Sequence, residues 1–206
     1  MRELLLRRRM IIYEEEVPQV SGYTVIGSPT ITDGIMVSGG ANNGIASPVY
    51  QFGSNPWAII TRIKTPPTAK NLEVIFFNIP AASDTVNTSQ RTIVVQRNNA
   101  TSFQVFAGTG SSSWNVLSGA VLFRNLAANT WYTIKLEFTG TAYRGWTKTD
   151  TGQFVLSGSS NSATPIGSNQ RICFGMTRNA GPYWSGSYDL KKTKIYIDGA
   201  LWWRAI

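Results

Sequence analysis

Apolar and polar residues alternate in short runs from residue 20 onward, and turn-forming residues separate these runs. Such alternation predicts β-strands with one buried side and one solvent-facing side. The clearest run covers residues 131–139 and predicts that Tyr132, Ile134, Leu136 and Phe138 point inward while Lys135 and Glu137 point outward. The pattern therefore predicts a chain built from strands and turns.

The C-terminal stretch predicts a strand, a glycine-rich loop and a closing hairpin. The strand covers residues 172–176, and the loop after it carries Tyr183 and Trp184. Alternation from Asp189 onward places Ile195 and Ile197 on one face and Lys194, Tyr196 and Asp198 on the other. It leads to Asp198-Gly199, a pair typical of two-residue hairpin turns, and to a last strand at residues 201–203. We expect this hairpin to complete a sheet, so truncation here should damage the fold more than truncation at most termini.

Strands are predicted along the rest of the chain at residues 23–26, 34–37, 49–52, 57–64, 72–79, 91–97, 102–107, 142–148 and 153–156. Residues 72–79 are apolar on both faces, which predicts a central strand. Polar loops are expected around residues 111–113 and 157–167. About a dozen short antiparallel strands cannot bury both faces as one flat sheet. The predicted fold class is therefore all-β, a two-sheet antiparallel jelly-roll sandwich.

Residues 1–18 differ in pattern from the rest and predict a separate arm or helix before a domain at residues 19–206. The apolar part is too short for a signal peptide or a membrane span, because arginines interrupt it. Two interpretations stand side by side: an arm that anchors the protein or forms oligomers, and a frayed tail. The residues of the predicted anchoring arm are Leu4, Leu5, Leu6, Arg7, Arg8, Arg9 and Met10.

The composition agrees with a strand-and-turn protein and adds a basic surface. Charged residues make up 15% of the chain, and the formal net charge is +8. This charge fits an anionic partner such as a teichoic or acidic polysaccharide, a membrane, nucleic acid or an acidic protein, or only a soluble basic surface. No RNA-binding or helix-turn-helix pattern accompanies the basic residues, so we do not predict nucleic-acid binding.

The residues that most enzyme mechanisms need are missing from the sequence. The chain has no histidine and one cysteine, Cys173, which is predicted to be a free buried thiol. Histidine-dependent nucleophilic catalysis and zinc sites built on histidine are therefore excluded. Glycosidases need two carboxyl groups beside the scissile bond, and no two acidic residues after Glu16 lie within five positions of each other. A pair formed across strands, such as Glu73 with Glu137, stays open.

Three motifs carry a resemblance to a known superfamily. They are W-Y-T-I-K-L-E-F-T-G-T from Trp131, Phe174-Gly175, and G-S-Y-D-L-K-K-T-K-I-Y-I-D-G from Gly186. With them the chain resembles the concanavalin A-like lectin/glucanase superfamily in its laminin-G-like branch. The run G-S-P-T-I-T-D-G-I-M-V-S-G from Gly27 and the ending are similar to domains in structural proteins of tailed bacteriophages and prophages of gut bacteria. The start L-L-L-R-R-R-M is similar to such proteins too.

Carbohydrate recognition uses aromatic rings beside hydrogen-bonding groups, which selects candidate binding residues in the loops and near the turns. The strongest pair is Tyr183 and Trp184, and the alternative for it is packing over a sheet edge or a subunit contact. The remaining candidates are Tyr143, Arg144 and Trp146, next to a tight turn, and Trp114, in a serine-rich loop. No cofactor or metal is predicted, although Asp150 and Asp189 could hold calcium as some laminin-G-like relatives do.

Together these observations and the resemblance predict a non-enzymatic bacteriophage virion structural protein, placed on the capsid, on a head fibre or on the tail. We expect other virion proteins and further copies of the chain as partners, and many copies on the virion would allow weak contacts with host cell-surface glycans to add up through avidity. Assembly on the virion in the host cytoplasm is the expected localisation. The alternatives are a carbohydrate-binding receptor-recognition module and a glycoside hydrolase.

Overall fold

The structure is a computed structural model that describes residues 18–40, 42–68, 70, 73–81, 93–99, 101–108, 114–160, 165–176 and 183–206, with backbone alone for 98–99, 106–108 and 114–122. The secondary structure of these residues is entirely β, in two sheets packed face to face. Among them there is no helix of the length and apolarity that a membrane crossing requires. The predicted all-β jelly-roll sandwich is confirmed.

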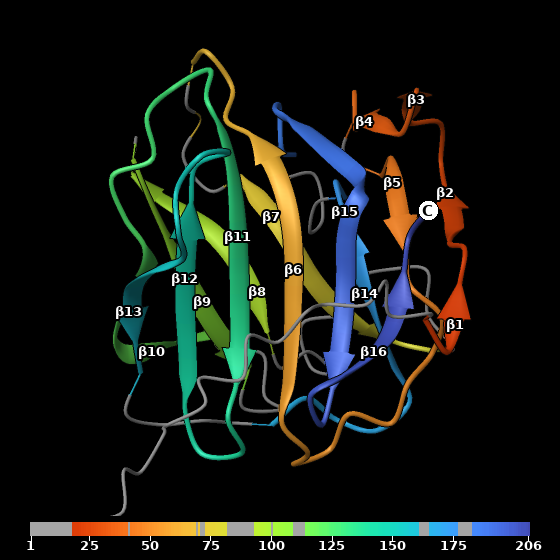
Figure 1. Ribbon diagram of the computed structural model, residues 1–206, viewed down its shortest axis with the longest axis vertical. Coiled ribbons are helices and arrows are strands. Elements are labelled where there is room, and N and C mark those ends of the chain that lie inside the picture. Colours follow the sequence, from red (N-terminus) through yellow and green to blue (C-terminus); the bar gives the residue numbers. More distant parts are fainter. Residues whose placement is uncertain are drawn as a thin grey trace, which may run out of the picture.

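The front sheet faces the viewer in Figure 1 and has nine strands within the described residues. Its main order is β1 (Val20–Ser21), β16 (Ala200–Arg204), β15 (Ser187–Ile197), β6 (Trp57–Lys64), β11 (Trp131–Phe138), β12 (Tyr143–Lys148) and β13 (Val155–Ser159). At one end of β15, β4 (Ile35–Val37) pairs with it and carries β3 (Thr30–Thr32). The strands pair antiparallel except β1 with β16.

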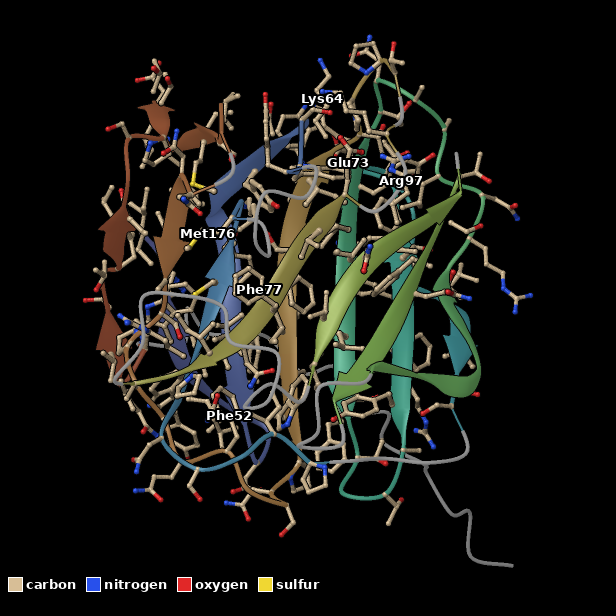
Figure 2. The ribbon with its side chains drawn as sticks, turned by 180° about the vertical axis from the view of Figure 1, so that it is seen from behind. Phe52, Lys64, Glu73, Phe77, Arg97 and Met176 are labelled. Carbon is tan, nitrogen blue, oxygen red and sulfur yellow. The ribbon has the colours of Figure 1, made fainter. Side chains whose placement is uncertain are left out.

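The back sheet is nearest the viewer in Figure 2 and has seven strands within the described residues. Its order is β10 (Trp114–Phe123), β9 (Ser102–Gly108), β8 (Val94–Asn99), β7 (Val74–Pro80), β14 (Gln170–Phe174), β5 (Gly44–Ala46) and β2 (Thr24–Ile26). As predicted, β7 is a central strand, because it pairs with β8 and β14 and is buried on both faces.

The hydrophobic core lies between the two sheets, where inward side chains of both sheets form one buried cluster. The front sheet contributes Ile59, Ile63, Ile134, Leu136 and Phe138, and the back sheet contributes Ile75, Phe76, Val95, Phe103 and Phe174. This confirms the inward side chains predicted for residues 131–139; Tyr132 is only partly buried but also packs against this cluster.

A hydrogen bond ties the sheets together through the core. The Tyr188 hydroxyl, from β15, donates to the Ile75 carbonyl of β7 at 2.6 Å and accepts from the Gly175 N–H at 3.2 Å. Burial raises the pKa of Tyr188 well above its ordinary value, so this phenol stays a neutral donor.

The closing hairpin forms where the sequence predicted it. Asp198 and Gly199 both have positive φ, 49° and 82°, as a type I′ turn requires. The turn leads from β15 into β16, whose Trp203 is fully buried. The last strand lies between β15 and β1 and so joins the two ends of the described chain.

Three local predictions are wrong. Trp114 begins β10 instead of sitting in a serine-rich loop; Ser118-Gly119 interrupt the apolar pattern there, and the pairing with β9 shifts register between Val116 and Val121. Residues 49–52 form no strand, since Tyr50 makes only an isolated bridge with Gln170. The loop predicted from residue 157 begins later, because β13 continues to Ser159.

Two further predictions fall outside the described residues. These are the loop at residues 111–113 and the anchoring arm with Leu4, Leu5, Leu6, Arg7, Arg8, Arg9 and Met10. Cys173 is a free, buried thiol in β14, as predicted.

Candidate functional site

The outer face of the front sheet carries a regular array of polar and aromatic side chains. Because side chains alternate along each strand, residues paired across β12, β11, β6 and β15 form rows on this face. The rows are Lys148–Thr133–Arg62–Asp189, Trp146–Lys135–Ile60–Lys194 and Arg144–Glu137–Ala58–Tyr196. Figure 1 looks directly onto this face.

Two adjoining hollows cross these rows, and we call them together the outer groove. The first has a volume of about 720 Å³ and is lined by Trp57, Ile60, Lys135, Glu137, Gln153, Phe154 and Tyr196, among others. The second has about 380 Å³ and is lined by Ile60, Arg62, Thr133, Lys148, Asp150, Phe154, Lys192, Lys194 and Tyr196. Both volumes lie in the range usual for ligand sites. Since Ile60, Lys148, Phe154 and Tyr196 line both hollows, the groove is continuous.

An aromatic ring and charged groups lie side by side in the groove. Phe154, between β12 and β13, is 36% exposed, and the Lys148 ammonium lies 5.1 Å from its ring centre. Within β11, next to β12, Lys135 donates to the Glu137 carboxylate at 2.9 Å. The groove thus offers a ring face next to hydrogen-bond donors and acceptors, which is the combination that binds sugars.

Arg62 organises the carboxylates at the end of the groove. Its Nε and Nη2 donate to the two Asp150 carboxylate oxygens at 2.9 and 2.7 Å, and its Nη1 donates to Asp189 at 3.1 Å. Its guanidinium carbon also lies 4.2 Å from the centre of the Trp131 ring. The hydrogen bonds from Arg62 lower the pKa of Asp150, so this carboxylate is ionised at neutral pH.

Trp184 is placed differently from the prediction, because it belongs to the core. It is fully buried against Phe103 and Tyr188. Its loop is held down at Ser185, whose N–H donates to the buried Glu73 carboxylate at 3.2 Å. Gly186 comes so close to β6 that an added Cβ would lie 2.0 Å from the Lys64 carbonyl oxygen. The prediction that Trp184 offers its ring to a ligand is therefore wrong.

Tyr143 is also wrongly predicted as a ligand contact. It is the first residue of β12 and points into the core, where its ring packs against Trp57 and Phe138. Burial raises its pKa far above the ordinary value for tyrosine. Alternation along β12 accounts for this position, since the residue after it is exposed.

The remaining candidates are distributed over separate places. Arg144 is exposed and Trp146 half-buried, and both lie on the outer face beside the groove, with the Lys135 ammonium 5.9 Å from the Trp146 ring centre. Tyr183 is half-buried beside β7, with the Lys70 ammonium 5.5 Å from its ring centre. The side chain of Trp114 lies outside the described residues. The predicted set therefore does not form one site.

The structure does not bring together the carboxylate pair that a glycosidase would need from Glu73 and Glu137. Glu73 is buried directly before β7 of the back sheet, and its carboxylate forms an ion pair with Arg97 at 2.9 Å. Glu137 lies on the outer face of the front sheet. Asp150 and Asp189 do meet, but both bind Arg62, and the lowered pKa of Asp150 is the opposite of what a general acid requires.

The same geometry bears on the calcium hypothesis. Asp150 and Asp189 come together as that hypothesis requires, but the Arg62 guanidinium lies between them and opposes a second cation. Within the described parts of the chain, no three acidic, histidine or cysteine side chains group in a way that could hold a metal ion.

Sequence reasoning missed two aromatic residues that line both hollows of the groove, Phe154 and Tyr196. The sequence pattern places Phe154 in a predicted strand and Tyr196 on the polar face of the closing hairpin. Their signal was present, because the same alternation that sends Ile195 and Ile197 inward sends Tyr196 outward. Tyr196 lies in the groove because β15 pairs with β6.

Comparison with known proteins supports the fold. No protein-family model and no curated protein sequence matches the chain. Domain 4 of AbnA, a GH43 extracellular arabinanase from Geobacillus stearothermophilus solved with arabinotriose, is similar with a TM-score of 0.58 and 16% identity over 85% of this chain and 77% of that chain.

Two other solved structures are similar to this chain. The CBM2 module of the evolved Dit of Lactobacillus casei BL23 phage J-1 has a TM-score of 0.53 and 12% identity over 88% of this chain and 83% of that one. The metal-free VIP36 exoplasmic/lumenal domain has a TM-score of 0.55 and 13% identity over 86% of this chain and 88% of that chain. The chain therefore has the concanavalin A-like jelly-roll fold, as its motifs predicted.

Proposed function

We propose that this protein is a non-enzymatic carbohydrate-binding module carried on the particle of a tailed bacteriophage, where it contributes weak, multivalent attachment to host glycans. The observation that carries the proposal is the outer groove, in which Phe154 and Tyr196 lie beside Lys148, Gln153 and Glu137. A ring face of this kind stacks on a sugar ring, and the polar groups bond its hydroxyls.

The similar structures and the motifs support both halves of this proposal. One neighbour is a domain solved with arabinotriose, and another is a carbohydrate-binding module of a phage protein. The motifs from Gly27 and from Gly186 resemble phage structural proteins. A module without catalysis fits the groove, because its carboxylates are bound to Lys135 and Arg62 and are not free to act as an acid–base pair.

Replacing either groove aromatic by alanine is expected to weaken glycan binding about tenfold, since a stacked ring contributes on the order of 1 kcal/mol beyond its area. The variants are Phe154→Ala and Tyr196→Ala, and the measurement is binding to a glycan array with the protein displayed in many copies. Tyr183→Ala is the matched control, because it removes an aromatic ring of the other candidate region.

These variants separate the possible sites. Equal binding by wild type, Phe154→Ala and Tyr196→Ala would contradict the groove as the site, and loss in Tyr183→Ala alone would move it to the glycine-rich loop. Release of reducing ends from any bound polysaccharide would contradict the non-enzymatic assignment.

The place on the particle is tested separately. Deletion of residues 1–18 is expected to abolish incorporation into virions, measured by mass spectrometry of purified particles, because the proposal assigns attachment to the particle to this apolar and charged segment. Retained glycan binding by the truncated protein is the control that its domain still folds. Normal incorporation of the truncated protein would contradict the anchoring role of Leu4, Leu5, Leu6, Arg7, Arg8, Arg9 and Met10.

A further inference from the structure

We propose that the outer groove selects anionic glycans: a sugar ring packs on Phe154 and Tyr196, and an acidic substituent, a carboxylate or a phosphodiester, binds Lys148, Lys192 and Lys194. This inference rests on the proposed carbohydrate-binding function and narrows its ligand class. A lysine ammonium suits either acidic group, since it acts as a compact point charge with three donors.

The charges of the second hollow support this ligand class. Lys148, Lys192 and Lys194 line it together with Arg62, and the carboxylate among its lining residues is Asp150. Both oxygens of that carboxylate already accept hydrogen bonds from Arg62. Among the described residues that line the hollow, Arg62 and the three lysines carry formal positive charges and Asp150 carries a negative one, so the lining has a net positive charge that attracts an anion.

A bulge in β15 brings the lysines together. Four residues, Leu190 to Thr193, lie between the partners of Arg62 and Ile60, where β6 has only Thr61. The Thr193 hydroxyl holds the bulge through contacts of 2.9 Å with the Thr61 hydroxyl and 3.0 Å with the Asp189 carbonyl. As a result Lys192 and Lys194 line the same hollow.

The neighbouring lysine is directed elsewhere. The side chain of Lys191 packs over Gly34 in the turn between β3 and β4, where an added Cβ would lie 2.9 Å from the Lys191 Cε. Lys191 is exposed and does not line the groove, so the bulge separates two adjacent lysines by position. This gives a charge-matched control within the chain.

The aromatic and cationic parts of the groove are close enough to bind one oligosaccharide. Phe154 and Tyr196 line both hollows, and Lys148 lies against the Phe154 ring where the two hollows join. A ring stacked on Phe154 thus has Lys148 beside it. The arrangement predicts that an acidic sugar or a phosphate-linked sugar binds better than the same sugar without the charge.

The test compares the binding of charged and neutral forms of the same glycan to wild-type protein displayed in many copies. The probes are a galacturonate hexamer, its methyl ester, a sugar-bearing poly(glycerol phosphate), and polyphosphate, which has charge but no sugar. The variants are Lys192→Gln with Lys194→Gln, and as control Lys70→Gln with Lys191→Gln, which removes the same net charge from exposed lysines outside the groove. An array of acidic and neutral bacterial glycans accompanies these probes.

We expect at least one acidic glycan to bind, with its neutral form at least tenfold weaker, and the groove variant to lose about tenfold in affinity while the control variant keeps wild-type affinity. Binding should also weaken as salt rises from about 20 to about 300 mM. Preference for the galacturonate or for the phosphate polymer identifies the acidic group.

Three results would overturn the inference. Equal binding of the methyl ester and the acid would show a neutral site and leave the carbohydrate-binding function standing. Binding of polyphosphate as tight as that of the glycans, and insensitive to Phe154→Ala, would show general attraction to polyanions. If the protein bound no glycan on the array, that result would contradict both this inference and the proposed carbohydrate-binding function.

Discussion

Replacement of Arg97 by methionine is expected to lower the free energy of unfolding by about 3–5 kcal/mol, because it leaves a buried carboxylate without its cation. Arg97 is 2% exposed and Glu73 is fully buried, and Figure 2 shows them together where β7 and β8 meet. The Arg97 Nε lies 2.9 Å from the Glu73 carboxylate. The guanidinium also packs over Phe103 and Trp184, 4.8 and 5.4 Å from their ring centres.

The pair also holds the glycine-rich loop, because the other Glu73 oxygen accepts from the N–H and the hydroxyl of Ser185. Urea unfolding measures the loss, and the double variant Glu73→Gln/Arg97→Met is the control. It removes both charges, so it should be less damaging than Arg97→Met alone. An Arg97→Met protein as stable as the wild type would show that Arg97 does not stabilise the buried Glu73 carboxylate.

Replacement of Trp203 by alanine is expected to cost about 3–5 kcal/mol, the usual range for a fully buried tryptophan. Trp203 lies in β16 between the sheets and stacks on Phe174 of the back sheet, with ring centres 6.1 Å apart. Its Nε1–H donates to the Gly22 carbonyl at 2.6 Å, next to β1. One side chain therefore connects both termini of the described chain to the core.

The control for this prediction is Trp203→Phe, which keeps a ring in the core and loses the hydrogen bond to Gly22. It should cost less than the alanine variant in the same urea unfolding experiment. Deletion of residues 200–206 removes β16 and is expected to prevent cooperative folding, since β15 and β1 lose their shared neighbour. A truncated protein with a normal unfolding transition would contradict the role of the closing hairpin.

The reassignment of Trp184 changes which aromatics are available for a ligand. Flanking glycines and serines made residues 181–186 look like an exposed loop. These same residues allow close approach instead, since Gly186 packs on β6 and Ser185 binds Glu73. Small residues next to an aromatic residue are therefore compatible with either an exposed ring or a buried, tightly packed ring.

The sequence by itself determined the fold class, the central strand, the closing hairpin with its Asp198-Gly199 turn, and the inward and outward sides of β11. These are local properties, since strand alternation and turn chemistry depend on near neighbours in the chain. It also determined that Tyr196 and Lys194 face away from Ile195 and Ile197.

Only the tertiary structure decided that the candidate site is the outer groove. Strand order placed β15 beside β6 and β11, and the bulge in β15 set Lys192 into the groove. It also decided that Glu73 meets Arg97 in the core and that Asp150 and Asp189 meet at Arg62. Such pairings join residues far apart in the chain, and no local pattern records which strands become neighbours or where a register shifts.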